Sequence, residues 1–300
     1  MKKFILKVLF FSLPVILLVI ALEVILQAIP NEYSVKNDYL DSNSNDVETL
    51  VLGSSHAFFG INPEYLPGNS FNAANVSQTI DYDLKILKKY DSNLRKIKTV
   101  IIPISYFSLF SALDHGAEKW RKKNYVIYYD LDIADQFKEH SEFLSNKLKL
   151  NITRSRLILM NYTPPVSKGG WGMSYESGNS QDLNKTADIA LKRHTVDNYD
   201  LLQNNIAALK EIIEICNKHN AKVVFFTPPA YKTYSQNLKK DQYDLTIKSI
   251  EGVVGDCKNC SYLNLINDAS YVKEDFYDAD HLNEVGAKKL SLFFKDYLEQ

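Results

Sequence analysis

Residues 98–104 form an apolar, β-branched run, and this segment constrains the fold more than any other. A strand that is apolar on both faces is typical of a parallel sheet covered by helices on each side. Apolar runs at 48–52, 70–73, 222–226 and 262–266 also predict strands, and apolar residues at helical spacing predict helices at 80–94, 199–217, 239–254 and 284–298. Because strands alternate with helices, we expect an α/β fold, a three-layer α/β/α sandwich with a parallel sheet.

Composition sets the size of the fold and disfavours one class of partner. A chain of 300 residues with 45% hydrophobic and 24% charged residues is long enough for one sizeable α/β domain with insertions. The formal net charge is −1, so the chain lacks the basic character typical of nucleic-acid-binding proteins. We therefore expect no nucleic-acid partner.

The N-terminus predicts a membrane anchor. Residues 4–29 are apolar except for Lys7, Pro14, Glu23 and Gln27. About 20 apolar residues suffice to span a bilayer. The lysines before and within the run should stay cytoplasmic, which places everything after Pro30 outside the cell. A cleaved signal peptide is the alternative, but no Ala-x-Ala-like site follows the apolar run. We interpret residues 1–30 as an uncleaved signal anchor, and hence predict a single-pass membrane protein with an extracytoplasmic C-terminal domain.

Three further segments follow the anchor. Residues 31–45 are rich in Asn, Asp and Ser and suit a polar stalk between membrane and domain. Residues 46–300 carry the α/β pattern, interrupted by an insertion at about 105–195, with helical pieces expected around 132–148. Loops this long inside a compact domain are uncommon and often functional. We expect the insertion to fold over the carboxyl edge of the sheet.

The cysteines leave more than one possibility open. Cys216 lies in a helical pattern and reads as a small buried apolar residue. Cys257 and Cys260 have a spacing that could close a small disulfide in an oxidising compartment, or they could stay free thiols. A zinc site would need further ligands, and the sequence has no second cysteine pair. No metal or other cofactor is expected.

Two short motifs predict a serine nucleophile and its base. Gly53-Ser54-Ser55-His56 follows the apolar residues 50–52, and a strand that ends in a tight glycine turn is a familiar way to expose a nucleophile at a helix start. Near the other end, Asp278 precedes His281 by three residues, so that one loop can supply a general base and the carboxylate that orients it. An ordinary turn with a capping serine is the alternative for Ser55.

On these motifs the chain resembles the SGNH (GDSL-like) hydrolase superfamily, and within it the membrane-anchored members linked to O-acylation of bacterial cell-surface polysaccharides. The resemblance covers roughly residues 46–298 apart from the insertion, and implies that Ser55 is the nucleophile, His281 the base and Asp278 its partner. Two family features are missing. Residues 71–78 lack the usual oxyanion-binding glycine, and residues 102–107 lack the usual asparagine.

Other polar residues near the two missing features could bind the oxyanion or the substrate. A backbone N–H near Asn75 and Ser77, or the Asn75 side chain, could replace the missing glycine, although a turn that satisfies its own backbone is an equal alternative. Ser105 stands where the family asparagine is expected. His56 is interpreted as lining the pocket.

The remaining histidines and carboxylates are weaker candidates for the triad. We expect His115, His140 and His194 to be surface residues of the insertion, and His219 to be structural at a helix end. Asp275 and Asp280 compete with Asp278 for the carboxylate role, and the family spacing selects Asp278.

Two functions from different classes follow from these features. The first is a membrane-anchored serine esterase or O-acetyltransferase that acts on a cell-surface or exported polysaccharide through an acyl-enzyme. The resemblance also implies a multi-spanning membrane O-acyltransferase as partner. In this reading Trp120 and Trp171 of the insertion stack on sugar rings, although core packing is the commoner fate of aromatic residues. The second is a catalytically inactive SGNH-like module that binds glycan or scaffolds a polysaccharide-modification complex.

Overall fold

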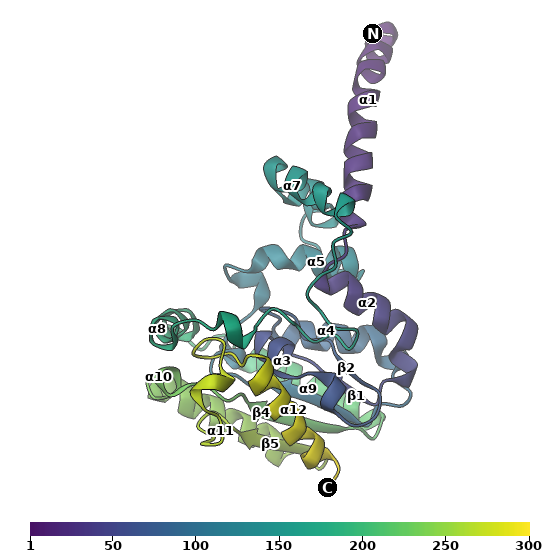
Figure 1. The fold of residues 1–300 in the computed structure, drawn as a ribbon. Coiled ribbons are helices and arrows are strands. Elements are labelled where there is room, and N and C mark those ends of the chain that lie inside the picture. The colour runs from purple at the N-terminus through teal and green to yellow at the C-terminus, as the bar shows by residue number, and fades with distance from the viewer. The chain divides into compact units, whose positions relative to one another are not determined.

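A computed structural model describes residues 1–300, except the side chains of Lys2, Ile5 and Leu9, and the chain divides into two compact units (Figure 1). We call residues 1–37 and 117–164 the anchor unit, and residues 38–116 and 165–300 the sheet unit. The insertion expected at about 105–195 is therefore not one piece. Its central part, 117–164, groups with the N-terminal helix, and its last part, 165–195, groups with the sheet.

The sheet unit contains five parallel strands in the order β2-β1-β3-β4-β5. The strands are β1 (Thr49–Val51), β2 (Ser70–Asn72), β3 (Thr99–Pro103), β4 (Lys222–Thr227) and β5 (Cys260–Asn264). The helices are α3 (Ser55–Gly60), α4 (Ile80–Tyr90), α8 (Leu183–His194), α9 (Leu202–Lys218), α10 (Lys232–Ser235), α11 (Lys240–Gly255) and α12 (Glu284–Leu298). This order places the point where strand order reverses between β1 and β3, which is where open α/β sheets bind ligands. The predicted three-layer α/β fold is confirmed.

Alternation along the strands divides the core between the two faces of the sheet. The neighbouring residues Val51, Ile101 and Val224 pack in one cluster with residues of α3 and α12. The residues that precede each of them along the strands point to the other face. There, α9 contacts both α4 and α11. Both faces are buried, which explains the continuous apolar pattern of 98–104 in the sequence.

Gly53 forms the turn between β1 and α3, and no other residue fits there without strain. Its φ is +113°, and a Cβ atom would lie 2.4 Å from two ring carbons of Pro103. We predict that Gly53→Ala lowers the free energy of unfolding by roughly 2–4 kcal/mol, because the change combines left-handed strain with overpacking. Thermal unfolding followed by circular dichroism measures this loss. Gly178→Ala is the matched control, since nothing lies within 4 Å of its Cβ position. Equal melting temperatures for the two variants would contradict the prediction.

The anchor unit contains helices α1 (Lys2–Gln27), α5 (Lys122–Tyr128), α6 (Glu142–Ser145) and α7 (Leu148–Leu159). Within α1, the 22-residue span Leu6–Gln27 has a mean hydropathy of 2.8 and most of its described side chains are exposed, so by length and composition this helix could cross a membrane. The protein therefore has the N-terminal apolar helix that the sequence predicts.

Three sequence-based expectations need correction. Residues 31–45, expected as a polar stalk, mostly form helix α2 (Glu32–Asn43), which begins in the anchor unit and ends in the sheet unit. The Asn31 side chain caps this helix by accepting the N–H groups of Tyr33 and Ser34, and its Leu40 is fully buried. In the segment 132–148, only α6 and a short 3-10 turn are helical, and the longer α7 begins at its end. Strand β5 lies two residues earlier than predicted.

The structure also decides between the alternatives for the cysteines. Cys257 and Cys260 form a disulfide just before and at the start of β5, and Cys216 is a free, buried cysteine in α9. The disulfide is compatible with an oxidising compartment, where such bonds persist.

Candidate active site

Ser55, His281 and Asp278 form one hydrogen-bonded chain. Ser55 is the first residue of α3, directly after the Gly53 turn, and His281 lies in the loop before α12. The Oγ atom of Ser55 is 2.8 Å from Nε2 of His281, and Nδ1 of His281 is 3.0 and 3.1 Å from the two carboxylate oxygens of Asp278. This is the arrangement in which an imidazole can take a proton from a serine while a carboxylate orients the ring.

The loop that carries His281 is held by its own hydrogen bonds. Oδ1 of Asp278 accepts the backbone N–H groups of Asp280 and His281 at 3.1 and 2.8 Å. Asn283 caps α12 by accepting the N–H groups of Val285 and Gly286. The Asp278 carboxylate therefore both shapes the loop and orients the His281 ring, as the Asp-x-x-His spacing predicts.

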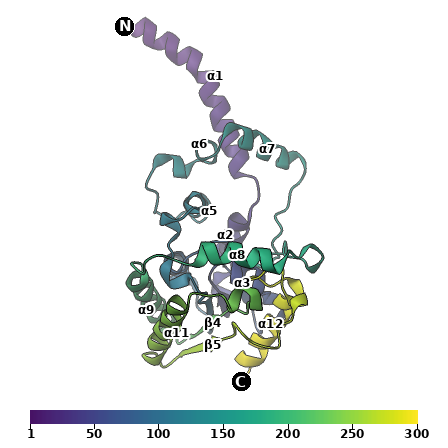
Figure 2. The same cartoon turned by 90° about the vertical axis from the view of Figure 1, so that its left-hand side faces the viewer.

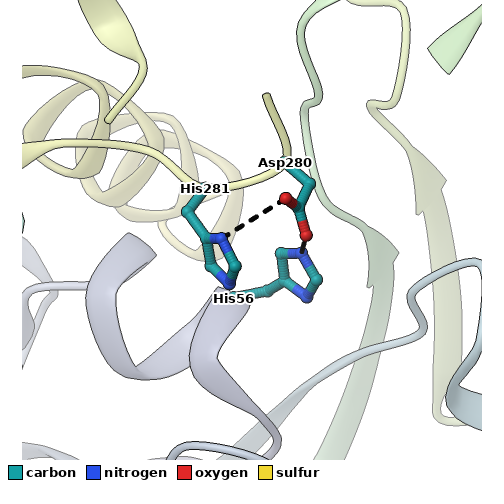
Figure 3. Close-up of side chains that lie close together, drawn as sticks. All are labelled: His56, Asp280 and His281. Atoms are coloured by element: carbon teal, nitrogen blue, oxygen red, sulfur yellow. Dashed lines mark ion pairs between the residues drawn. The ribbon is translucent and has the colours of Figure 1, made fainter. Parts of the chain in front are cut away.

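A second carboxylate, Asp280, lies beside two stacked imidazole rings and contacts a nitrogen atom of each (Figure 3). Its Oδ1 is 3.6 Å from Nδ1 of His281, and its Oδ2 is 3.4 Å from Nε2 of His56. The rings of His56 and His281 are nearly parallel, with centroids 4.6 Å apart. The buried arrangement of Ser55, His281 and Asp280 is thus also consistent with a catalytic triad, although Asp278 makes the shorter contacts with His281.

Burial and charge act differently on the two stacked histidines. Burial lowers the pKa of His281, but the charges of Asp280 and Asp278 outweigh this effect and raise it to about 9. Burial lowers the pKa of His56, and its contact with Asp280 only partly offsets that. Burial would raise the pKa of Asp280, but the neighbouring histidines lower it overall. At neutral pH the cluster therefore holds a protonated His281, a neutral His56 and an ionised Asp280.

The same three side chains are close enough together to be considered as metal ligands. A histidine binds a metal through a lone pair in the plane of its ring. Because the rings of His56 and His281 are stacked with an angle of 11° between their planes, one ion cannot lie in both planes. Nδ1 of His281 is also within hydrogen-bond distance of Asp278. The geometry favours a hydrogen-bonded cluster over a metal centre.

A buried aspartate, Asp83, accepts a hydrogen bond from the turn before Ser55. Asp83 of α4 accepts the N–H of Gly53 at 2.8 Å and the side-chain amide of Gln78 at 2.6 Å. Burial raises the pKa of Asp83 to about 7, and these two hydrogen bonds act in the opposite direction. Asp83 thus links the loop after β2 to the nucleophile turn, a role that sequence reasoning missed because a single aspartate in an amphipathic helix gives no signal.

The residues considered for the oxyanion have other contacts. The Asn75 amide nitrogen donates to Gln78 at 2.9 Å and to the Ala73 carbonyl at 3.3 Å, so its side chain holds the loop. Ser77 is half-buried, with a left-handed φ of 61°. The Ser105 hydroxyl lies 2.9 Å from Nδ1 of His56. If Ser105 donates this bond, His56 presents its Nε2–H to Asp280, so Ser105 positions His56.

An aromatic stack lies beside the His281 ring. Tyr175, from the last part of the insertion, stacks on Phe59 and on Tyr277 with centroid distances of 3.7 and 3.8 Å. Its ring meets the His281 ring edge to face, with centroids 5.5 Å apart. The sequence analysis selected Trp120 and Trp171 among the aromatic residues of the insertion, but not Tyr175.

The two tryptophans belong to different units. Trp171 lies in the sheet unit, where its Nε1–H donates to the Phe59 carbonyl at 2.6 Å, near the end of α3. Trp120 lies in the anchor unit and is exposed, with the Arg121 guanidinium 4.4 Å from its ring centroid. Only Trp171 is therefore tied to an element of the site, through the backbone of α3.

One expectation about the other histidines was wrong. His194, expected on the surface, is buried: its Nδ1 is 2.9 Å from the Tyr234 hydroxyl and 3.7 Å from Oδ2 of Asp280. Burial lowers its pKa to about 3. No sequence pattern distinguishes this lone histidine at the end of α8 from a surface residue.

The other residues considered for the base or the carboxylate of the triad are either exposed or have other partners. His115 and His140 are exposed, as expected. His219, at the end of α9, lies 2.6 Å from an Asp91 carboxylate oxygen. Asp275 accepts the Val272 N–H and the Lys289 ammonium, away from His281, which fits a structural role.

Comparison with known proteins adds little to this geometry. No family model matches the chain, and no curated protein matches it. Among solved structures, the chain is similar to one described provisionally as a platelet activating factor from Streptococcus pneumonia, with 11% sequence identity and a TM-score of 0.45. That similarity covers 96% of this chain and 99% of the other.

Proposed function

We propose that the protein is a membrane-anchored, extracytoplasmic serine acyl hydrolase or O-acyltransferase of the SGNH kind. Its substrate would be an acylated cell-surface or exported polysaccharide. One observation carries the proposal: the Ser55 hydroxyl lies 2.8 Å from Nε2 of His281, whose other nitrogen faces Asp278. A serine, an imidazole and a carboxylate in this order are the groups that acyl transfer through a covalent intermediate requires.

The reaction has two halves. When His281 is neutral, Oγ of Ser55 attacks the ester carbonyl carbon and gives its proton to Nε2 of His281. The bond to the alcohol then breaks, and His281 returns the proton to the leaving oxygen. In the second half, water or a sugar hydroxyl attacks the acyl-enzyme and loses a proton to His281. The bond between the acyl group and Oγ then breaks, and His281 gives the proton to Oγ of Ser55. Water gives an esterase and a sugar hydroxyl gives an acyltransferase.

The backbone at the start of α3 is the favoured oxyanion site in this proposal. The N–H groups of Ser55 and His56 lie in the first helical turn, where intrahelical acceptors are lacking. The N–H of Ser55 itself belongs to the nucleophile, so a developing negative charge on the substrate would form beside it. The Asn75 side chain, which is bonded within its own loop, would support the turn.

The proposed setting is the outer face of a bacterial cell membrane. An apolar span of membrane-crossing length, the two lysines before it (Lys2 and Lys3) and a disulfide in the sheet unit support an outward domain. The resemblance to polysaccharide-modifying SGNH proteins supports the substrate class. It also supports a multi-spanning membrane O-acyltransferase as the partner that would deliver the acyl group.

Labelling with a fluorophosphonate tests the proposal directly. The probe phosphonylates serines that a neighbouring base activates, so we expect it to modify Ser55 in the folded, full-length protein. Mass spectrometry of the labelled peptide locates the site. The Ser55→Ala variant and heat-denatured wild type should remain unlabelled. If the folded wild type takes up no probe while hydrolysing no acetyl ester, the alternative of a non-catalytic glycan-binding or scaffolding module is favoured.

A further inference from the structure

Helix α7 of the anchor unit exposes a stripe of large apolar side chains. Leu148, Ile152 and Leu159 lie on one face of this helix because their spacing is close to whole helical turns. They are 59%, 48% and 85% exposed, and the apolar residues Leu150, Ile158 and Met160, outside this face, are also exposed. Soluble surfaces rarely gather apolar residues in this way without a partner. The apolar residues of α7 do not line a protein core, which explains why the sequence pattern predicted helix at 132–148 and missed most of α7.

A half-buried set of hydrogen bonds ties the start of α6 to Glu23 of α1. The Glu23 carboxylate accepts the Ser141 hydroxyl at 2.6 Å and the N–H groups of Glu142 and Phe143 at 2.8 and 2.9 Å. Glu23 lies four residues before Gln27, the last residue of the apolar span, which is about 6 Å along the helix axis. Interfacial helices bury their apolar faces about 5–10 Å into the boundary between headgroups and acyl chains. The start of α6 is therefore at the depth of that boundary.

Helix α7 is held beside α1 by further contacts. Both α6 and α7 contact α1, and Figures 1 and 2 both show α7 beside the C-terminal end of α1. Glu142 of α6 pairs with Lys123 of α5 at 2.6 Å and with Arg154 of α7. Glu142 thus joins α5, α6 and α7. Helix α7 cannot rotate about its axis to move its apolar stripe without breaking the ion pair between Glu142 and Arg154.

The charge of the segment matches a bilayer surface. Residues 137–162 contain five Lys or Arg and two Asp or Glu, so the formal charge is 5 − 2 = +3. Lys149 and Arg156 both lie along one side of the apolar stripe on α7, where their long side chains could reach lipid headgroups. Basic residues beside a membrane-spanning helix favour contact with anionic lipid.

We propose that α7 lies in the membrane interface beside α1, with Leu148, Ile152 and Leu159 in the acyl-chain region of the outer leaflet. The protein then contacts the bilayer through two elements, one that spans it and one that lies in its surface. The proposal rests on insertion of α1 but not on the triad. A membrane protein that covers the same stripe would be a different partner, and the experiment below separates the two.

Spin labels report the depth of single residues in the full-length protein, reconstituted alone in vesicles of phosphatidylcholine and phosphatidylglycerol. Ile152→Cys and Leu159→Cys place labels on the stripe. Ile189→Cys in the sheet unit is the matched control, because Ile189 is also 48% exposed. Leu17→Cys, midway along α1, reports insertion of the anchor. The native cysteines do not interfere, since one is buried and two form a disulfide.

We expect the labels at positions 152 and 159 to collide more with oxygen than with a water-soluble nickel chelate, as at position 17. The ratio should invert at position 189. Labels at 152 and 159 that behave like the one at 189, while the label at 17 reports bilayer, would overturn the proposal and leave a protein partner as the explanation. A water-exposed label at position 17 would instead overturn the membrane anchor, and with it the proposal.

Discussion

Replacing Ser55 with alanine is expected to lower kcat/KM for a small acetyl ester by roughly a factor of 10⁴ or more. The nucleophile is lost, and the water that could replace it lacks the geometry of the 2.8 Å contact with His281. His281→Ala should cause a loss of similar size because Ser55 then has no base. Purified full-length variants in detergent, assayed at several ester concentrations, provide the measurement.

The double variant sharpens this prediction. Members of a triad act as one unit, so removing both side chains should cost little more than removing one. Ser111→Ala is the matched control, since the hydrogen bond from the Ser111 hydroxyl to the Ser108 carbonyl is long, at 3.4 Å. Melting temperatures of all variants should stay near that of the wild type. Losses that multiply in the double variant would show that Ser55 and His281 act in separate steps.

Replacing Asp278 and Asp280 one at a time is expected to separate two effects on His281: the orientation of its ring and the charge beside it. Asp278→Asn should lower the maximal rate by roughly 10²–10⁴, because an amide opposite Nδ1 stabilises the wrong tautomer of His281. This is a smaller loss than for Ser55→Ala. Asp280→Asn removes charge at 3.6 Å but leaves the Asp278 contacts, so the maximal rate should fall less than about tenfold.

The pH profile distinguishes the two carboxylates more clearly. His281 must be neutral to act as base, and its pKa is raised to about 9, so activity should rise with pH through that region. In Asp280→Asn the charge that raises this pKa most is gone, and the rise should move to lower pH. Rates of a small ester across the alkaline range, with the melting temperature measured at each pH, test this. An unchanged midpoint would mean that Asp280 does not act on His281.

Much of the fold and the triad could be predicted from the sequence, because local signals were strong there. The run at 98–104 identified a strand buried on both faces, and helix α12 has the predicted bounds. Each of the two motifs joins a backbone feature to a reactive group: a glycine turn precedes Ser55, and a carboxylate that can shape a loop precedes His281. The contact between Ser55 and His281 could therefore be predicted although 226 residues separate them.

What could not be predicted depends on contacts between distant segments. His194 approaches Asp280 only because α8 packs against α10, and the sequence gives no pairing signal for either residue. Residues 31–45 looked like a stalk because polar residues outnumber apolar ones, yet the few apolar side chains such as Leu40 are buried. Glu23 appeared only as an interruption of an apolar run, whereas its role is to bind the segment after Ser141.

The two halves of the site lie on two elements of the fold, and Gly60 lies at the joint between them. Ser55 and His56 belong to α3, while Asp278, Asp280 and His281 belong to the loop fixed to α12. The joint is the packing of α3 on α12, where the Cβ position of Gly60 would contact Leu290 at 3.7 Å. A bulky side chain at position 60 would therefore act as a wedge, opening the gap between nucleophile and base without touching either.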